Sequence, residues 1–341
     1  MGGQQKCPRY ATISTQHLHG RPYCNDLLTL MSRFLRRLFV FLLISIVPLC
    51  IADVCGTHYL HSLNHYAIEP YADFMQQGPA KRGVNTLVMG TSRAWVQYNP
   101  AILDSILGTT TYNMGCDGRM ISTIMLKWDT YWYTGNPKPS LIIYDVGPFG
   151  MLLDHDYGYE REQFFPYIAC CKPVRRFVWS GSFCNLFEKI IPGIRYLGVH
   201  SFKSNNWNEP YNIDGYNGKE LKWNGNALRQ TETIDFTRQP EALVCFDNFL
   251  HDCDSLNIHV VLVLSPIYIE GQRKIRDLVA MKDLYQRMAS RYNLPLLDYT
   301  KDPMCDDTNN FYNATHLNSL GADHFSRLVA HDLDQLGVVS R

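Results

Sequence analysis

The chain has no excess of charge of either sign, because its 32 basic residues balance its 32 acidic residues. Proteins that bind the phosphate backbone of nucleic acid typically carry a basic patch or stripe. We therefore expect no nucleic-acid partner. Charged residues make up 19% and apolar residues 46% of the 341 positions, which excludes a disordered or collagen-like chain and allows a substantial buried core.

The sequence also lacks the usual marks of a metal or cofactor site. Its 11 cysteines include no CxxC pair and no Cys/His cluster with zinc spacing. It has no glycine-rich phosphate loop either. We therefore expect no metal and no cofactor. The odd number of cysteines leaves at least one thiol without a partner in the chain, and the sequence leaves the disulfide pairing open.

One long apolar run is present near the N-terminus. Residues 38–52 carry no charge and follow Arg33, Arg36 and Arg37 closely. A basic flank followed by an apolar segment is typical of an export signal or a signal anchor. The run alone is shorter than the roughly 20 residues of a comfortable membrane span. We predict a signal anchor, or transmembrane helix, over residues 33–53; a buried core helix is the alternative.

The anchor divides the chain into unequal parts. Residues 1–32 show no periodic apolar pattern, and we expect a non-globular leader there. Translation that starts at Met31 would give a more typical export signal. Residues 54–83 are predicted as a linker and residues 84–341 as the folded domain. With the arginines held inside the cell, the protein would be a single-pass cell-membrane protein whose main domain is periplasmic or extracellular.

Short apolar runs alternate with helical patterns from residue 84 onward. Continuous apolar strands joined by helices are typical of parallel βαβ units that are buried on both faces. The pattern predicts an α/β fold, a three-layer α/β/α sandwich with a mostly parallel central sheet of flavodoxin-like type. It breaks between about residues 150 and 240, where we expect a long insertion that forms a lid or a wall of a cleft. Strands are predicted at 84–90, 109–113, 140–146, 258–265 and 294–298, and helices at 94–107, 118–133, 241–256, 274–292 and 318–336.

Two side chains that suit nucleophilic catalysis stand near the turns after the first and last strands. Ser92 lies in Gly90-Thr91-Ser92-Arg93, where the N–H groups of a helix start can stabilise an anion. His316 precedes the closing helix. A serine hydroxyl needs an adjacent base, and the imidazole pKa suits that task. In an open parallel sheet both turns lie at the same edge. A plain N-cap at Ser92 and a solvent-exposed His316 are the alternatives.

Three blocks of the chain resemble those of the SGNH (GDSL-like) hydrolase family, in particular its membrane-anchored branch related to polysaccharide O-acylation. Residues 90–93 (Gly-Thr-Ser-Arg) are similar to the first block and residues 112–115 (Tyr-Asn-Met-Gly) to the second. Residues 313–318 (Asn-Ala-Thr-His-Leu-Asn), followed by Gly321-Ala322, are similar to the last block and are the most specific of the three. The resemblance extends over roughly residues 84–340.

The resemblance implies a role for each of these positions. Ser92 would be the nucleophile and His316 its base. The backbone N–H groups of Ser92 and Gly115 would form the oxyanion hole. Asn313 stands three residues before the histidine, where the family usually has an aspartate that orients the imidazole. An asparagine can accept the imidazole N–H but carries no charge; Asp306 or Asp307 could supply a substitute carboxylate.

A second departure concerns the block after the third strand. The family usually has Gly-x-Asn-Asp there, whereas this chain has Gly147-Pro148-Phe149-Gly150. One oxyanion donor is therefore missing, and such a donor is worth about 10²–10³ in rate. Arg93, beside the candidate nucleophile, either orients an anionic group of the substrate or forms a structural ion pair. Asp145, at the end of the same strand, either bonds near the site or pairs with a neighbouring turn.

The resemblance implies an ester hydrolase or O-acyltransferase that acts on acylated cell-surface glycans. The expected partners are then an acylated carbohydrate and, through the N-terminal helix, the membrane. The alternative is a catalytically weak or inactive subunit of the same fold that binds glycans or serves in assembly. The sequence leaves open the substrate and acceptor, and whether the acyl group passes to water or to a sugar.

Overall fold

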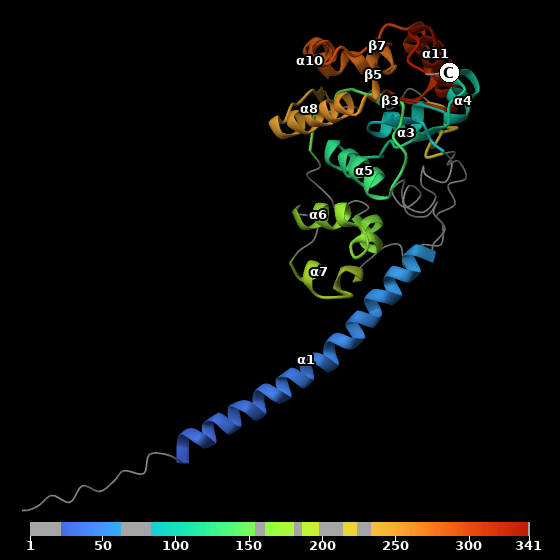
Figure 1. Cartoon of the computed structure of the whole chain (residues 1–341). Helices are drawn as coiled ribbons and strands as arrows, with labels where there is room; N and C mark the ends of the chain where they lie inside the picture. Colours follow the sequence, from blue (N-terminus) through green and yellow to red (C-terminus); the bar gives the residue numbers. More distant parts are fainter. Residues whose placement is uncertain are drawn as a thin grey trace, which may run out of the picture.

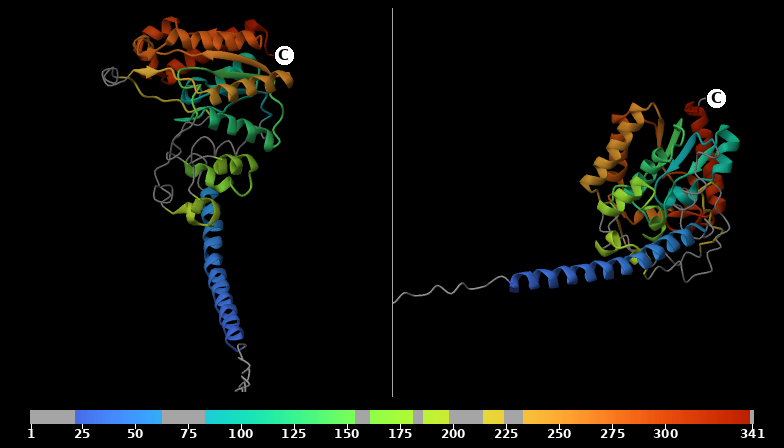
Figure 2. Two further views of the ribbon diagram at one scale, coloured as in Figure 1. Left: turned by 90° about the vertical axis from the view of Figure 1, so that its left-hand side faces the viewer. Right: turned by 60° about the horizontal axis from the view of Figure 1, so that its bottom comes forward.

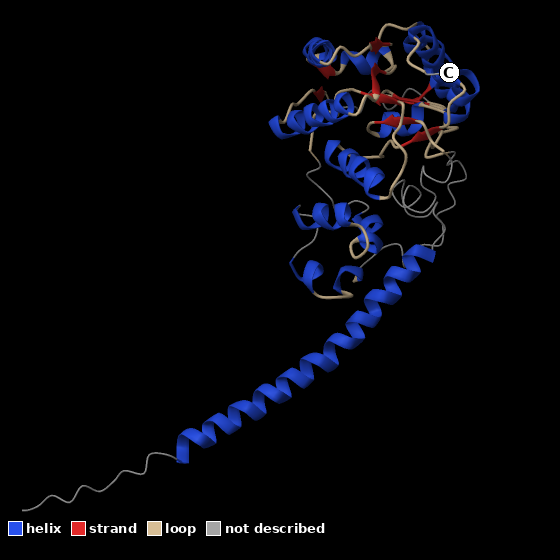
Figure 3. Cartoon of the chain, viewed as in Figure 1, coloured by secondary structure: helices blue, strands red, loops and turns tan. Residues whose placement is uncertain are grey.

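The computed structural model describes residues 22–62, 83–153, 161–180, 186–197, 214–223 and 233–339. A long helix, α1 (Pro22–Ser62), projects from an α/β domain that contains the strands (Figures 1 and 3). The views in Figure 2 show the same arrangement from two other sides. The catalytic candidates all lie in the α/β domain.

The central sheet has five parallel strands in the order β2-β1-β3-β5-β7. Each predicted strand is present, although each is shorter than predicted. The parallel α/β architecture is therefore confirmed. The strands are β1 (Thr86–Met89), β2 (Thr111–Asn113), β3 (Leu141–Asp145), β5 (His259–Leu264) and β7 (Leu296–Asp298).

The sheet is buried on both faces, which explains why its strands are continuously apolar. Neighbouring residues along a strand point to opposite faces. In β3, Ile142 and Tyr144 belong to one hydrophobic cluster, and Leu141 and Ile143 belong to the other. Two separate clusters on one sheet require helices on both sides, as in the predicted three-layer sandwich.

The helices divide between the two faces of the sheet. The first cluster contains residues of α5 (Ile121–Tyr133), α8 (Pro240–Ser255) and α10 (Leu278–Arg291). The second contains residues of α4 (Pro100–Leu107) and α11 (Ser319–Leu336). Figure 1 shows α5, α8 and α10 on one side of the strands and α4 and α11 on the other.

The predicted helix over residues 94–107 is wrong as a single element. The chain forms α3 (Ser92–Gln97), leaves the helical conformation, and starts again as α4. The residue before a proline disfavours the helical conformation, and Pro100 follows Asn99. The Asn99 side chain then accepts a hydrogen bond from the Ala101 N–H at 3.1 Å and caps α4. Ser92 thus stands on a helix of only six residues.

The predicted insertion contains short elements in its described parts. These are η3 (Arg161–Tyr167), α6 (Lys172–Ser180), α7 (Leu186–Ile190), η4 (Ile194–Tyr196) and β4 (Ile234–Asp235). Much of the stretch from 205 to 227, on which the prediction of an irregular insertion rested, lies outside the described residues. The remaining short elements are α9 (Ile269–Arg273), β6 (Ile275–Arg276), η7 (Pro303–Asp306), η8 (Thr308–Asn310), β8 (Phe311–Asn313) and β9 (His316–Leu317).

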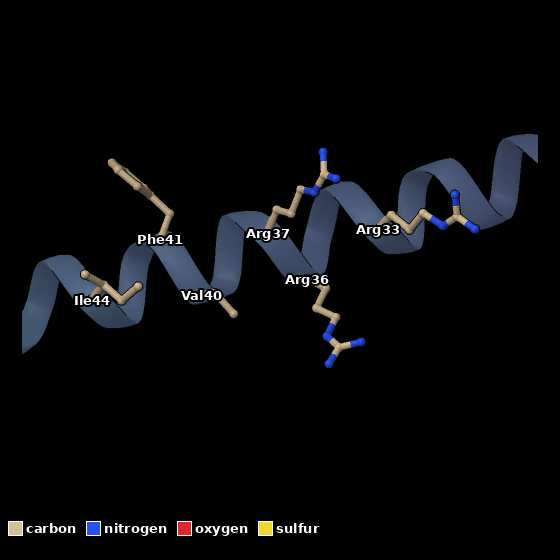
Figure 4. A pocket seen from close by; sticks show the side chains of 6 residues that line it. All are labelled: Arg33, Arg36, Arg37, Val40, Phe41 and Ile44. Carbon is tan, nitrogen blue, oxygen red and sulfur yellow. The ribbon is translucent and has the colours of Figure 1, made fainter.

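Helix α1 contains a candidate single membrane span. Residues Leu27–Tyr59 have a mean hydropathy of 2.7 in their most apolar window, and none of that window is buried. The helix extends beyond both ends of the predicted anchor, residues 33–53, so the anchor boundaries stay a prediction. Arg33, Arg36 and Arg37 project outward from α1 ahead of Val40, Phe41 and Ile44 (Figure 4). This order of basic and apolar side chains suits a membrane boundary.

Candidate active site

The candidate site lies where the order of the strands reverses. The chain passes from β1 to β2 on one side of β1, and β3 lies on the other side. In open α/β sheets, ligands bind at the carboxyl ends of the strands at such a switch point. Ser92 begins α3 directly after β1, and Gly147 follows β3. The fold therefore brings the predicted first block to the position where a ligand would bind.

Ser92 and His316 are in hydrogen-bond contact, although 224 positions separate them in the chain. The distance from Ser92 Oγ to His316 Nε2 is 2.8 Å. His316 lies on β9, the second strand of a hairpin with β8. The sequence places His316 near a turn before the closing helix, whereas the structure gives it a strand backbone paired with β8. This distance matches that of a nucleophile paired with its general base.

Asn313 holds the other nitrogen of the imidazole. Its Oδ1 lies 3.0 Å from His316 Nδ1 and accepts the backbone N–H groups of Thr315 and His316, each at 2.9 Å. Two backbone donors directed at one atom identify that atom as the amide oxygen, which can only accept. In this pair Nδ1 must therefore donate. Nε2 is then free to accept the proton of Ser92.

The threonine beside the histidine offers Nδ1 a second contact. Thr315 Oγ1 lies 3.0 Å from Nδ1 and 3.3 Å from Asn313 Oδ1. The predicted substitute carboxylates have other positions in the fold. Asp307 accepts hydrogen bonds from the Asn309 backbone and side chain at 2.9 and 2.8 Å, and Asp306 ends η7. Asn313, and neither of these aspartates, is thus the residue whose side chain contacts Nδ1.

The environment of His316 favours the neutral ring. Burial, together with the positive charge of Arg93, lowers the pKa of His316 to about 3. The imidazole is therefore uncharged and able to accept a proton at neutral pH. Stabilising the imidazolium that forms during a reaction is harder here, because Asn313 adds no negative charge.

Arg93 belongs to a buried polar network below the nucleophile. Its Nη2 donates to Asp145 Oδ1 at 2.8 Å and to the Val146 carbonyl at 2.5 Å. Tyr98 donates to the other carboxylate oxygen at 2.8 Å. Gly147 packs against the guanidinium so closely that a Cβ there would lie 2.3 Å from Nη2. The structural ion pair predicted as one alternative for Arg93 is thus present, with Asp145 as its partner.

One nitrogen of Arg93 has no bond within the described part of the chain. Nη1 is buried and has no hydrogen-bond partner there. The residue as a whole is 4% exposed. A buried donor without a partner costs free energy, and such groups occur where a ligand completes the bonding. Arg93 therefore combines a structural ion pair with one unused donor near His316.

Gly115 lies against α3, but its backbone N–H is hydrogen-bonded to Asn113. A Cβ at this position would lie 2.2 Å from the Trp95 backbone nitrogen, so only glycine fits. The Gly115 N–H donates to Asn113 Oδ1 at 2.8 Å. Buried Lys127 donates to the carbonyl oxygens of Met114 and Gly115 at 3.2 and 3.3 Å and holds the same loop. In this structure, the second predicted oxyanion donor is not directed at a substrate.

Several residues around the site were missed by sequence analysis. The Tyr312 ring stacks on the His316 ring with centroids 5.4 Å apart. Lys219, from the insertion, lies over the Trp95 ring at 4.9 Å. Burial raises the pKa of the nearby Asp117 carboxyl. Of these residues, only Tyr312 could have been predicted to lie near the site, because it directly precedes Asn313 on β8.

The segment 214–223 of the insertion is hydrogen-bonded to elements that carry site residues. The Asn217 N–H donates to the Trp95 carbonyl at 3.1 Å, and the Trp223 N–H donates to the Phe311 carbonyl at 3.2 Å. The insertion is thereby attached both to the nucleophile helix and to the histidine hairpin. Within the described ranges, no group of three His, Cys, Asp or Glu side chains could hold a metal ion.

Comparisons with known proteins give matches of structure only. No family model matches the chain, and the search of curated proteins finds no match. Among solved structures, the chain is similar to one described as a lipolytic protein of the G-D-S-L family from Desulfitobacterium hafniense. That match has a TM-score of 0.38 and 11% identity over 72% of this chain and 98% of the other. The chain is also similar to an acetyl xylan esterase, with a TM-score of 0.37 and 14% identity over 74% of this chain and 98% of the other.

Proposed function

We propose that the protein is a membrane-anchored serine esterase or O-acyltransferase that acts on acylated cell-surface glycans. The single observation that carries this proposal is the 2.8 Å contact between Ser92 Oγ and His316 Nε2 at the switch point of the sheet. The resemblance of the three sequence blocks to SGNH hydrolases supports the reaction class. The N-terminal helix supports the anchor, with the α/β domain outside the cytoplasm.

The proposed reaction begins when Ser92 Oγ attacks the ester carbonyl and its proton passes to His316 Nε2. Asn313 Oδ1 keeps the proton on Nδ1 and so keeps Nε2 available. The alkoxide that forms on the carbonyl oxygen would be stabilised by the backbone N–H of Ser92 at the start of α3. The imidazolium returns its proton to the leaving alcohol, and an acyl-serine remains.

Water or a sugar hydroxyl completes the cycle. His316 removes a proton from this acceptor, the acceptor attacks the acyl-serine, and Ser92 regains its proton. Gly115 can contribute as a second oxyanion donor only if its N–H leaves Asn113, which predicts a small movement of the loop on substrate binding. Arg93 Nη1 is an unused donor beside Gly147, where the third block begins, and is proposed to orient the substrate.

The test is turnover of an acetyl ester by purified protein. Ser92→Ala should abolish turnover, because no other group can form the acyl-enzyme in this account. Ser105→Ala is the matched control, since Ser105 is exposed on α4 and its hydroxyl donates to the Ile102 carbonyl of the same helix at 2.8 Å. Turnover that survives Ser92→Ala at the wild-type rate would rule out the mechanism.

A non-catalytic glycan-binding or assembly subunit is the second candidate. Three observations favour it: Asn313 in place of a carboxylate, the strongly lowered pKa of His316, and the committed Gly115 N–H. Under this alternative, the wild-type protein would bind an acylated oligosaccharide without turning it over. Calorimetric binding combined with no ester release would favour this candidate over the enzyme.

A further inference from the structure

A cluster of large apolar side chains is exposed on the insertion. Leu186, Phe187 and Ile190 of α7 are 64%, 67% and 58% exposed. At 100° per residue these three positions fall within about 100° of the helix circumference. Trp179 and Leu197 are also exposed, at 49% and 70%. Exposed large apolar side chains concentrated within residues 179–197 make this part of the insertion a candidate binding surface.

The cluster lies beside a set of polar contacts that attach the insertion to α1. The Asp53 carboxylate accepts the Gly193 N–H at 2.9 Å and pairs with Arg195 at 2.5 Å. Thr57 Oγ1 lies 2.6 Å from the Tyr196 hydroxyl. Residues 193–196 follow α7 directly. The position of α7 along α1 is therefore set by side-chain contacts and not only by the chain connection.

These contacts between the insertion and α1 lie where α1 would leave a membrane. A hydrocarbon core of about 30 Å takes roughly 20 helical residues. Counted from Leu38, the first residue after the arginines, a span of that length ends near Thr57. Asp53 lies close to that end, and its pairing with Arg195 reduces the cost of a carboxylate there. Figures 1 and 2 show α7 on the side of the folded domain from which α1 projects.

Basic side chains accompany the apolar cluster. Lys172, Arg175 and Arg176 of α6 are exposed. The half-buried Lys189 of α7 donates to the Trp179 carbonyl at 3.1 Å and so joins α7 to α6. A surface that combines tryptophan, phenylalanine and leucine with lysine and arginine suits a phospholipid interface, where the rings enter the headgroup region and the cations meet phosphate. The apolar face of a partner protein would not require the basic groups.

We propose that this apolar cluster, Trp179, Leu186, Phe187, Ile190 and Leu197, docks on the phospholipid surface of the bilayer that α1 crosses. The proposal rests on the membrane anchoring in the proposed function. Docking at a second place would keep α1 and the domain attached to it from tilting relative to the bilayer. It would hold the Ser92 site at a set orientation to the surface that carries its substrate.

The test uses the full chain in liposomes that contain anionic phospholipid. An environment-sensitive fluorescent amino acid is incorporated at one of three positions. Phe187 tests the cluster, Ile44 tests the span, and Val279 of α10 is the control because it is an apolar residue with 73% exposure on the α/β domain. Each sample is measured with and without lipids that carry a spin label on the acyl chain.

Docking predicts a blue shift and quenching by the spin-labelled lipid at positions 187 and 44, and neither change at 279. Quenching at 44 without quenching at 187 would overturn the docking while leaving the anchor in place. A blue shift at 187 without quenching by lipid would overturn it in favour of a protein partner, such as a second copy. No quenching at 44 would overturn the anchor and the docking together.

Discussion

At the scale of single residues, Asn313 is the most informative position in the site. Its oxygen provides the geometric part of the usual aspartate, because backbone N–H groups fix the amide orientation and hence the tautomer of His316. In the serine-protease triad, replacement of Asp by Asn costs about 10⁴, in part because the tautomer is wrong. Here only the charge is missing, so a smaller deficit is expected.

Asn313→Asp should therefore increase ester turnover. A carboxylate on Nδ1 would raise the pKa of His316 and stabilise the imidazolium that forms during acylation. An opposite charge at this distance shifts a pKa by 1–3 units, which supports a gain of about 10–100-fold in kcat. Asn313→Ala, which removes the acceptor, should lower kcat. Equal rates for the wild type and both variants would show that Nδ1 plays no part.

The lowered pKa of His316 predicts an unusual pH profile. The histidine stays neutral, and able to act as a base, until the pH approaches its pKa of about 3. We expect kcat/KM for acetyl ester turnover to stay level from pH 7 to about pH 4.5, while an ordinary histidine, with a pKa of about 6.5, would lose activity tenfold per unit below that value. A descending limb with a midpoint near 6.5 would contradict a histidine whose pKa is lowered in the folded protein.

The lowered pKa of His316 also makes the free energy of unfolding depend on pH. The folded-state pKa lies below the unfolded value of about 6.5. Between these two values the unfolded chain binds a proton that the folded chain does not. The stability is therefore fully present above about pH 6.5 and falls as the pH decreases toward 3. His316→Gln should make this part of the stability profile flatter.

At the scale of elements, the buried apolar side chains of helix α8 pack against a neighbouring helix and the sheet. Phe249 is 2% exposed and meets Trp128 of α5 and Tyr144 of β3, with ring centroids at 5.3 and 5.4 Å. One aromatic side chain thus joins two helices and the sheet. Val244, on the same helix, is 58% exposed.

Phe249→Ala should lower the free energy of unfolding by about 3–5 kcal/mol, since truncation of a buried phenylalanine loses its burial and leaves a cavity. Val244→Ala should change it by less than about 0.5 kcal/mol. The free energy of unfolding of each variant is to be measured by urea titration of the full chain in detergent, with tryptophan fluorescence as the signal. Comparable losses for the two variants would mean that α8 does not pack as described.

The strands and most helices could be predicted from sequence because their apolar periods are local properties. The five parallel strands follow from runs such as residues 258–265, which are apolar on both faces. The break between α3 and α4 could have been predicted from Asn99-Pro100. It was missed because the helical pattern on either side resembles that of one continuous helix. The hairpin that carries His316 has too few residues to show a period.

The candidate site could be predicted only in part. The pairing of Ser92 with His316 followed from strand topology, which brings both turns to one edge of the sheet. The contacts of Arg93 with Asp145 and of Tyr312 with His316 depend on side-chain directions after folding. The Gly115 N–H bond to Asn113 spans two residues, yet no pattern in the sequence distinguishes it from a free N–H.

At the scale of the whole molecule, three parts of the chain matter for the proposed function. Helix α1 carries the candidate span, the sheet edge carries Ser92, and residues 214–223 join the nucleophile helix to the histidine hairpin. The eight cysteines that the structure describes are free thiols. One of them, Cys170, is exposed on the insertion and reports on which side of the membrane the folded domain lies.

A membrane-impermeant maleimide added to intact cells should label Cys170 if the domain is outside the cytoplasm. Mass spectrometry of peptides locates the label, and Cys170→Ser provides the control for other thiols. Labelling that occurs only after lysis would place the domain inside and exclude cell-surface glycans as its substrate.

The central claim is that Ser92 is a nucleophile activated by His316. Fluorophosphonate labelling of the full chain, with the adduct located by mass spectrometry, tests it most directly. The account predicts an adduct on Ser92 in the wild type, a much slower reaction in His316→Gln, and an unchanged reaction in Ser105→Ala. A wild-type protein that remains unmodified at Ser92, or a His316→Gln variant that reacts equally fast, would contradict it.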